Sequence, residues 1–268
     1  MKTLSPGNYI GQNRRQYKLP GLTFTRCFFA KEFNSDWHRH EHSHLTLCLK
    51  GNSIEKRKKQ DIPCSPGMLL LYPSDLLHRN TDYVSNSESF SIEFENAWCG
   101  KFEINNQQNC RHNIIIDPLV KMKIIAVMRE VSQPDAQSNL CLEATVLDIL
   151  HSLAGSTTNT ARPPWITSLY ELLHDEHNTH WTLTSLSEKL NIHPVTISKC
   201  FPRFFNTTLG EYIRKIKTQQ SLGDLARKSI PLEQIALKYG FADNAHFTRV
   251  FKKHTGLTPS AYRHLVTG

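Results

Sequence analysis

The C-terminal half of this 268-residue chain contains an internal repeat, and no other feature restricts the fold as strongly. The repeated positions are apolar, at an offset of 49 residues that becomes 50 after the turn. The pairs are Leu183 and Leu232, Leu186 and Ile235, Leu190 and Tyr239, Ile192 and Phe241, Ile197 and Phe247, Cys200 and Val250, Phe201 and Phe251, and Tyr212 and Tyr262. Two copies of one small structural unit are therefore expected.

Each copy has the sequence signals of two helices joined by a tight turn. In the first copy, residues 191–193 form the turn, and Pro194 suits the first turn of the next helix. In the second, Gly240 is a natural left-handed helix end, and Asp243 or Asn244 caps the next helix. Such short connections predict two helix-turn-helix motifs. The predicted motifs span residues 183–205 and 232–254.

The second helix of each copy carries a polar face with the same spacing. Apolar residues at i, i+3 and i+4 are expected to be buried, which leaves another side to polar side chains. Arg and Lys bond guanine edges or phosphates, and Asn bonds adenine edges. A solvated polar face is the alternative interpretation for one isolated helix, but two copies in register favour DNA. The outward triplets are Thr196, Lys199 and Arg203, and His246, Arg249 and Lys253.

Residues 165–265 resemble the AraC/XylS family of bacterial transcription regulators. The second copy is the most specific part, in the segment IALKYGFADNAHFTRVFKKHTGLTPSAYR from Ile235 to Arg263. The resemblance implies two helix-turn-helix units, bridged by a long helix at Leu209 to Ala226, that enter successive major-groove segments of double-stranded DNA. The DNA-binding residues that it implies are His193, Thr196, Lys199, Arg203, Asn244, His246, Arg249 and Lys253.

Two residues depart from that pattern. Pro202 lies inside the first recognition helix and removes the hydrogen bond to the carbonyl of Ser198. It is expected to kink or end the helix, at a cost of about 3 kcal/mol if nothing compensates. Gly223 falls in the bridging helix, where it costs about 1 kcal/mol relative to Ala. It indicates either close packing or a softer bridge.

The N-terminal half has a different sequence pattern. From Leu22 to Ile116, short runs rich in β-branched and aromatic residues alternate with Gly, Pro, Asn and Ser, which predicts strands and turns. Lys121 to Val131 and Leu140 to Leu153 carry apolar residues at helical spacing, and this predicts two helices that cap the sheet or join two subunits. The predicted parts are a sensory domain at 1–116, a helical pair at 117–154, a linker at 155–164 and a DNA-binding domain at 165–268.

A histidine-rich segment, WHRHEHSHLTLCLKG, occupies residues 37–51. If it forms one strand, His38, His40, His42 and His44 all project from the same side. Together with Gly51, Gly67, Pro73 and His78, the segment resembles the two motifs of the cupin β-barrel. Cupins bind a divalent metal there through three His and one Glu, and His44 takes the Glu place. The metal ligands that the resemblance implies are His38, His40, His44 and His78.

Two interpretations of these histidines stay open. Four imidazoles suit Zn, Ni, Cu or Fe, which are all borderline metals. Alternatively, the rings are neutral groups that pack in a barrel mouth or contact a small effector, as the barrels of AraC-type regulators usually do without a metal. The basic run at residues 56–59 has a simpler interpretation, a solvated hairpin loop.

The net charge and the composition indicate which class of molecule the protein binds and where it is located. The formal charge of +8 favours an anionic partner, and residues 163–268 hold 13 Lys or Arg against 8 Asp or Glu. The first residues lack the apolar core of a signal peptide, and no apolar run is long enough for a membrane span, which predicts a protein of the bacterial cytoplasm. Seven Cys without a CxxC pair argue against a disulfide framework, and most of them are expected to be small buried side chains.

These patterns together predict a two-domain α+β protein, with a cupin-like β-barrel and an all-α DNA-binding domain. The predicted function is a sequence-specific transcription regulator, an activator and not an enzyme, controlled by an effector or a metal. It would form a homodimer and contact RNA polymerase. A cupin dioxygenase or isomerase is the competing class, but the spacing of Glu41, Glu93 and Glu95 singles out no general base. An interaction module that has lost DNA binding is the third, with Pro202 in its favour.

Overall fold

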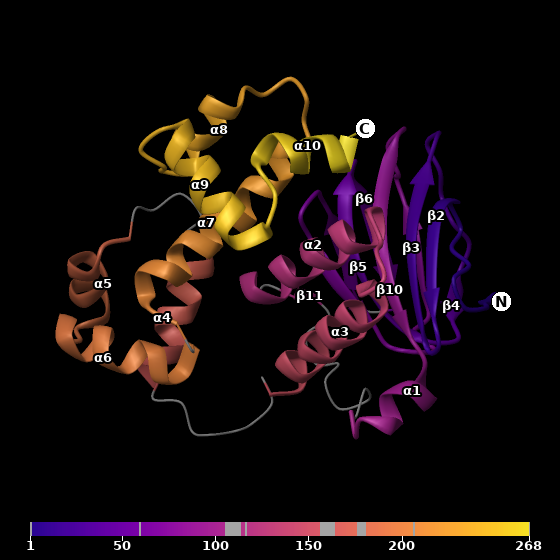
Figure 1. Cartoon of the computed structure of the whole chain (residues 1–268), viewed down its shortest axis with the longest axis horizontal. Helices are drawn as coiled ribbons and strands as arrows, with labels where there is room; N and C mark the ends of the chain where they lie inside the picture. Colours follow the sequence, from indigo (N-terminus) through magenta and orange to yellow (C-terminus); the bar gives the residue numbers. More distant parts are fainter. Residues whose placement is uncertain are drawn as a thin grey trace.

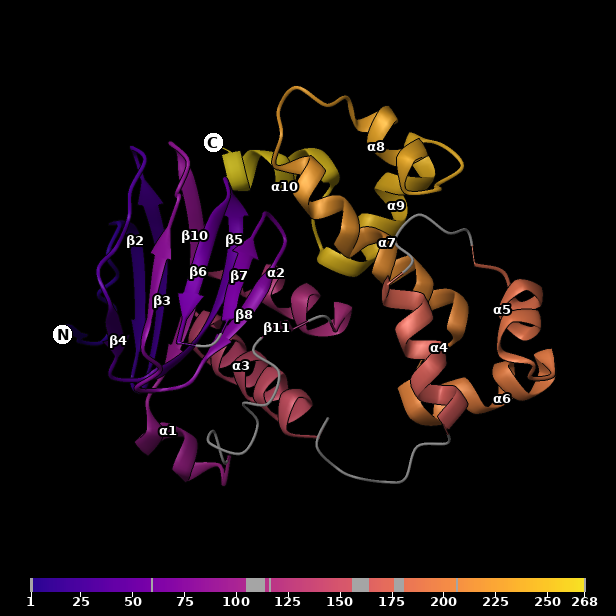
Figure 2. The ribbon, with the colours of Figure 1, turned by 180° about the vertical axis from the view of Figure 1, so that it is seen from behind.

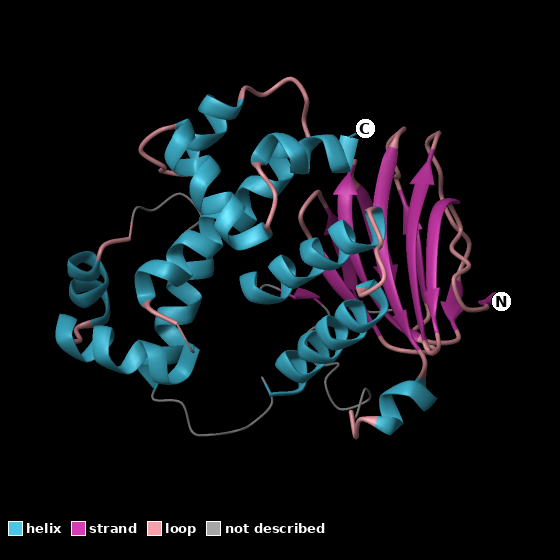
Figure 3. Cartoon of the chain, viewed as in Figure 1, coloured by secondary structure: helices cyan, strands magenta, loops and turns pink. Residues whose placement is uncertain are grey.

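The computed structural model of the chain describes residues 2–58, 60–104, 114–115, 117–155, 164–175, 181–205 and 207–267. The N-terminal part consists of two β-sheets with helices beside them, and the C-terminal part consists of helices alone (Figure 1, Figure 3). The prediction of a β-rich half followed by an all-α half is therefore confirmed. Of the predicted linker at 155–164, residues 156–163 lie outside the described residues.

The strands are divided between two sheets. The five-stranded sheet has the order β1 (Lys2–Leu4), β4 (His38–His40), β9 (His78–Thr81), β6 (Ser53–Arg57) and β7 (Gln60–Cys64). The six-stranded sheet has the order β11 (Ile114–Ile115), β8 (Leu69–Tyr72), β5 (Ser43–Lys50), β10 (Ser87–Phe94), β3 (Leu22–Phe29) and β2 (Gln12–Leu19). In the described part of the chain, the hydrogen-bonded ladders form these two sheets and not the closed barrel that we expected.

The histidine-rich segment does not form one strand, so that prediction was wrong. β4 ends at His40 and belongs to the five-stranded sheet, whereas β5 begins at Ser43 in the six-stranded sheet. The chain crosses between the sheets at Glu41 and His42. The crossing keeps His38, His40 and His44 around one space, and His42 lies in the connection.

The two faces of the six-stranded sheet differ in polarity. Along β5, the side chains of Leu45, Leu47 and Leu49 join the main apolar core, which lies on the side of α2 (Pro118–Ser132) and α3 (Ser138–Gly155) (Figure 1). The alternate side chains line small cavities between the two sheets. They are His44, Thr46 and Cys48. The space between the sheets therefore holds these side chains beside a small apolar cluster built around Ile62 and Leu70, and the main apolar core lies outside it. A short helix, α1 (Asn96–Lys101), follows β10.

The helical part contains two helix-turn-helix motifs, one at each end of a long helix. The first motif is α5 with α6 and the second motif is α8 with α9, at the positions that the repeat predicts. The bounds are α4 (Pro164–Asp175), α5 (Leu183–Leu190), α6 (Pro194–Phe205), α7 (Leu209–Leu225), α8 (Leu232–Lys238), α9 (Asn244–Thr255) and α10 (Pro259–Thr267).

Pro202 does not end the first recognition helix, because α6 continues to Phe205. Of the two expected outcomes, a kink or an end of the helix, the second was therefore wrong. Packing accounts for the difference: the rings of Phe201 and Phe205 stack with centroids 4.2 Å apart, and both rings contact Tyr212 of α7. These contacts hold the last turn and offset the hydrogen bond that the proline removes.

The two motifs belong to different hydrophobic cores. The first motif packs with α4 and the N-terminal half of α7 in a small core built around Leu186, Ile197 and Phe201. The second motif shares the main core with the six-stranded sheet and with α2 and α3. Figures 1 and 2 show α5 and α6 at the end of the molecule farthest from the sheets. The boundary between the two cores therefore falls within α7.

Contacts between residues far apart in the sequence seat the second motif on the sheets. A Cβ atom at Gly223 of α7 would lie 2.9 Å from the carbonyl oxygen of Pro66, so only glycine fits there. Arg26 of β3 donates a hydrogen bond of 2.6 Å to the carbonyl of Leu265 in α10. Of the two explanations that the sequence left open for Gly223, the structure supports close packing.

Candidate nucleic-acid interface and histidine cluster

The turns of the two motifs are built in the same way. The amide of Ile192 donates to the carbonyl of Ser187 at 3.1 Å, and at an offset of 49 residues Phe241 donates to Ala236 at 2.9 Å. Each turn contains a left-handed residue directly before that donor, Asn191 with φ of 52° or Gly240 with φ of 69°. These are the bonds that close a helix before a left-handed residue, so the sequence repeat is a repeat of geometry.

The recognition helices begin with equivalent side-chain caps. The carboxylate of Asp243 accepts the amide of His246 at 2.6 Å, and at the equivalent position a ring nitrogen of His193 accepts the amide of Val195 at 3.3 Å. His193 therefore has a structural role at the start of α6. Its side chain is exposed beside the first turn, where the sequence predicts contact with DNA.

The structure places most of the predicted DNA-binding side chains at the surface. In α6, Thr196 and Lys199 are exposed, whereas the side chain of Arg203 lies outside the described part of the chain. In α9, Asn244 and Arg249 are exposed. The opposite side of each helix is buried, as predicted, at Ile197 and Phe201 and at Phe247, Val250 and Phe251. Each recognition helix therefore presents polar residues outward from an apolar base.

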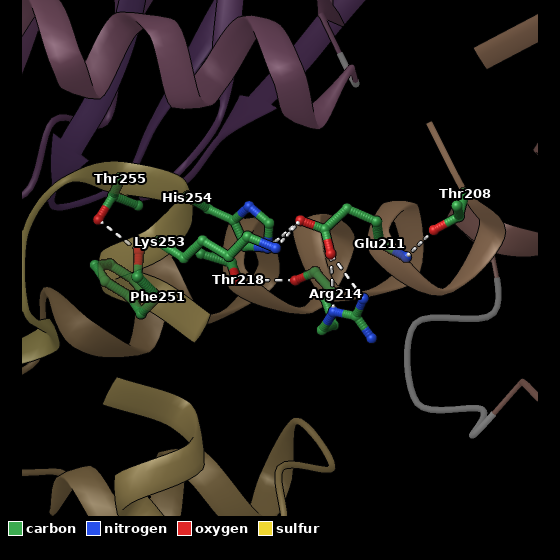
Figure 4. A network of polar contacts seen from close by, with 8 residues as sticks. All are labelled: Thr208, Glu211, Arg214, Thr218, Phe251, Lys253, His254 and Thr255. Carbon is green, nitrogen blue, oxygen red and sulfur yellow. Dashed lines mark hydrogen bonds and ion pairs between the residues drawn. The ribbon is translucent and has the colours of Figure 1, made fainter. Parts of the chain in front are cut away.

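Two predicted residues in α9 have intramolecular partners. His246 is half-buried; its Nδ1 accepts the amide of Ala242 at 3.3 Å, and its ring packs edge-on against Phe241. Lys253 forms an ion pair of 2.8 Å with Glu211 in the first turn of α7 (Figure 4). Both interactions orient α9, so these two residues are less available for base contacts than Arg249.

Glu211 connects α7 with α9. Its carboxylate also pairs with Arg214 at 2.7 Å, and the imidazole of His254 lies 3.7 Å away (Figure 4). Hydrogen bonds from Lys253 and Arg214 lower the pKa of Glu211 to about 2. The role of Glu211 was not predicted from the sequence, because no local signal relates this residue to Lys253, 42 positions later in the chain.

Glu211→Gln is expected to lower the free energy of unfolding by about 0.5–1 kcal/mol at neutral pH, because both cationic partners are largely exposed. A carboxylate with a depressed pKa contributes stability above its ordinary pKa of 4.5, and this contribution is lost as the pH falls toward the folded pKa of about 2. The difference between wild type and variant should therefore shrink between pH 4.5 and pH 2.

Urea unfolding at a series of pH values measures this effect. Glu233→Gln, which neutralises an exposed carboxylate in the first turn of α8, is the matched control. A pH-independent difference for the Glu211 variant would show that its carboxylate does not stabilise the fold through charge.

Three imidazoles converge between the sheets. His38 and His40 come from β4, and His78 of β9 lies directly opposite His38 in the ladder. One ring nitrogen from each lies within 4.8 Å of the other two, and all three side chains are buried. They line a cavity of about 50 Å³ that also contacts Tyr9. The three ring nitrogens are thus arranged like the ligand atoms of a metal site.

The three rings are neutral at pH 7. Burial, and then the charge of neighbouring imidazoles, lowers the pKa of His40 to about 3 and of His38 to about 4, and burial lowers that of His78 to about 4. Carbonyl oxygens of Asp36 and Leu76 lie 2.9 Å from Nδ1 of His38 and His78. Each of those nitrogens therefore carries the hydrogen, which leaves Nε2 with a lone pair.

His44 lies beside this cluster and not within it. Its ring centroid is 4.4 Å from that of His40, and the ring stacks on Tyr72 with centroids 4.5 Å apart. Of the four predicted ligands, the structure thus brings three together and places the fourth against a tyrosine. Tyr72 itself donates to the buried carboxylate of Glu55.

Comparisons with known proteins support the two helix-turn-helix motifs of the C-terminal part. A sequence profile described as a helix-turn-helix domain matches residues 186–264. Probable transcription factor PqrA from Proteus vulgaris is 34% identical over 88 residues, which cover 33% of this chain and 72% of that protein. HTH-type transcriptional activator RhaR from Mannheimia succiniciproducens is 21% identical over 238 residues, which cover 84% of this chain and 86% of RhaR.

Two further similarities cover a smaller share of the related protein or have a lower sequence identity. The Msm operon regulatory protein of Streptococcus mutans is 23% identical over 106 residues, which cover 40% of this chain and 38% of that protein. Among solved structures, ToxT from Vibrio cholerae aligns over 93% of this chain and 100% of ToxT, with a TM-score of 0.39 and 14% identity. None of the described helices combines the length and the apolar character that crossing a membrane requires.

Proposed function

The chain belongs to the AraC family of transcription regulators, and we propose that it is a sequence-specific regulator that places α6 and α9 in successive major-groove segments of one duplex. The observation that carries the proposal is the equivalence of the two motifs: the same turn bonds, a side-chain cap at the same position and exposed polar side chains on both recognition helices. Helix-turn-helix proteins contact base edges with the first turns of the second helix.

The bridging helix supports simultaneous binding of both motifs. With 17 residues, α7 is about 25 Å long, which is comparable to the roughly 34 Å that separates major-groove segments one turn apart. Lys199 and Arg249 are the candidates for base contacts, because both are exposed on recognition helices. Lys252 and Lys228 are exposed cations that suit phosphates. Affinity should therefore fall steeply with salt concentration.

Selection of DNA fragments from a random-sequence pool, followed by titration at 50 and 200 mM salt, tests this function. We expect one enriched sequence with two half-sites about ten base pairs apart, and a strong salt dependence on every duplex. If the selection enriches no sequence and the protein binds all duplexes with equal affinity, the proposal of sequence-specific recognition is wrong.

The N-terminal half would act as a cupin-like sensory domain. Its space between two sheets, with cavities of about 50 and 30 Å³, suits a small ligand or ion. Because the second motif shares the main core with the six-stranded sheet, a ligand that favours one arrangement of the sheets would shift the population able to bind DNA. Homodimer formation, contact with RNA polymerase and an activating role remain parts of this proposal.

The histidine cluster fits a divalent transition metal, with His38, His40 and His78 as the residues that would hold it. Three neutral imidazoles are the ligand form that Zn, Ni, Cu and Fe require. The backbone carbonyls that fix the rings of His38 and His78 are the outer partners usual for ligating histidines. Among the described residues, Nδ1 of His40 is buried with no hydrogen-bond partner, which a bound group would explain. Such a metal would act as a sensed ligand.

His40→Ala and His78→Ala are each expected to remove the metal, because two imidazoles rarely retain a transition metal that three hold. Elemental analysis after loading with Zn and dialysis measures the metal content per chain. His42→Ala is the matched control, since His42 lies in the connection outside the cluster. Unchanged metal content in both cluster variants would eliminate this site and leave the packing interpretation of the histidines.

A further inference from the structure

Two cysteines from opposite sheets lie beside the same small cavity between the sheets. Cys48 lies on β5 of the six-stranded sheet and Cys64 ends β7 of the five-stranded sheet. Both are free thiols, and both belong to one small hydrophobic cluster. Both also line one cavity of about 30 Å³. The two thiols are thus neighbours across the interface between the sheets.

The surroundings of the pair suit oxidation by a small peroxide. The neighbouring thiol of Cys48 lowers the pKa of Cys64, which favours the nucleophilic thiolate at that position. The cavity that both cysteines line accommodates about two water-sized molecules, enough for hydrogen peroxide.

We propose that Cys48 and Cys64 are a peroxide-sensitive thiol pair whose disulfide links the two sheets and alters the contact between the sheets and α7. The sulfur of Cys64 attacks hydrogen peroxide, so an S–O bond forms, the O–O bond breaks, and the released hydroxide takes a proton to become water. The thiol of Cys48 then displaces the sulfenic oxygen: the S–S bond forms and a second water leaves with the proton of Cys48. Two thiols are oxidised and one peroxide is reduced to two waters.

The link to α7 runs through the turn that follows Cys64. In this turn, Met68 donates to the carbonyl of Ser65 at 3.0 Å, and Gly67, with φ of 87°, donates to the carbonyl of Cys48 at 2.8 Å. The turn is therefore held to β5 at the same residue that carries the second thiol. It also carries Pro66, whose carbonyl abuts Gly223 of α7.

Closing the disulfide is expected to displace this turn. An S–S bond is about 2.0 Å long, which is shorter than any non-bonded contact between two sulfur atoms, so the bond draws the end of β7 toward β5. The backbone of Gly223 fits closely against Pro66 and leaves no space to absorb a shift. The movement is therefore expected to change the packing of α7, which holds the second motif.

Peroxide treatment of the full chain, followed by non-reducing peptide mapping, tests the chemistry. Trypsin can cut at Lys50, between the two cysteines, so the disulfide appears as a linked pair of peptides. We expect this pair in wild type and in Cys141→Ser, which removes an exposed thiol elsewhere, but not in Cys48→Ser or Cys64→Ser. If peroxide modifies Cys141 in wild type while Cys48 and Cys64 stay reduced, the proposal is wrong, whether or not the serine variants fold.

Hydrogen exchange of residues 216–225 in α7 tests the coupling. We expect oxidation to change the exchange rate at least twofold in wild type and in Cys141→Ser. Formation of the disulfide with unchanged exchange in α7 would overturn the coupling.

The effect on DNA rests on the proposed function and is measured separately. We expect at least a fivefold difference in Kd between the reduced and oxidised protein, on a duplex selected by the reduced protein. If the reduced protein binds no DNA, the proposed function fails, whereas peptide mapping and hydrogen exchange still decide the thiol switch. Equal affinity in both states would contradict a regulatory role for the disulfide.

Discussion

Phe201→Ala is expected to unfold the first helix-turn-helix motif and to leave the rest of the chain folded. Phe201 is fully buried in the small core, where its ring contacts Phe205 and Tyr212. Truncation of a buried phenylalanine costs about 3–5 kcal/mol. A core of this size has a small margin of stability, so the loss is comparable to the whole stability of the motif.

Phe247→Ala is the matched comparison in the second motif. Phe247 is equally buried, but it belongs to the main core shared with the six-stranded sheet. The same truncation there is expected to reduce protection in α2 and β5 as well as in α9. Hydrogen exchange followed by mass spectrometry resolves both patterns. Equal loss of protection in β5 and α5 for the Phe201 variant would mean that the two cores do not unfold separately.

Arg249→Ala is expected to weaken binding to the selected operator by about 1–3 kcal/mol, or roughly 5- to 150-fold, with little effect on scrambled duplexes. Arg249 is exposed on α9, and the described structure gives it no ion pair. Its guanidinium is therefore free to make a bidentate contact with a guanine edge.

Lys253→Ala is expected to behave differently. Lys253 already pairs with Glu211, so its removal should weaken binding evenly across sequences. Lys101→Ala, which removes one charge from α1 beside the sheets, is the control for net charge. Gel-shift titrations on matched and scrambled duplexes distinguish these outcomes. Equal losses on both duplexes for the Arg249 variant would assign that residue to the phosphate backbone.

Local signals were sufficient to predict the helical part. Gly240 and Pro194 mark a helix end and a helix start through their own backbone preferences, and Asp243 caps the next helix with its own side chain. These preferences act over four residues or fewer, so they survive in any tertiary context that keeps the helices. The spacing of Phe247 and Phe251 identifies the buried face for the same reason.

The histidine-rich segment shows where local signals were insufficient. Alternation predicts that His38 and His44 share one side of one strand, but it carries no information about where a chain leaves one sheet for another. His38, His40 and His78 converge because β4 and β9 are neighbouring strands of the five-stranded sheet, and these side chains face the space between the sheets. Three of the four predicted ligands therefore lie together, although the segment is divided between two strands, and binding of a metal stays a prediction.

What the sequence alone determined is the pair of motifs, the helix that joins them and the chemistry of the side chains available on each. Only the tertiary structure decided that the second motif shares a core with the sheets, that Pro66 meets Gly223, and that Lys253 pairs with Glu211. The physical reason is the range of the interactions. Helix ends and buried faces depend on neighbours within a few positions, whereas these contacts join residues at least 42 positions apart, and their free energy depends on packing that no local pattern encodes.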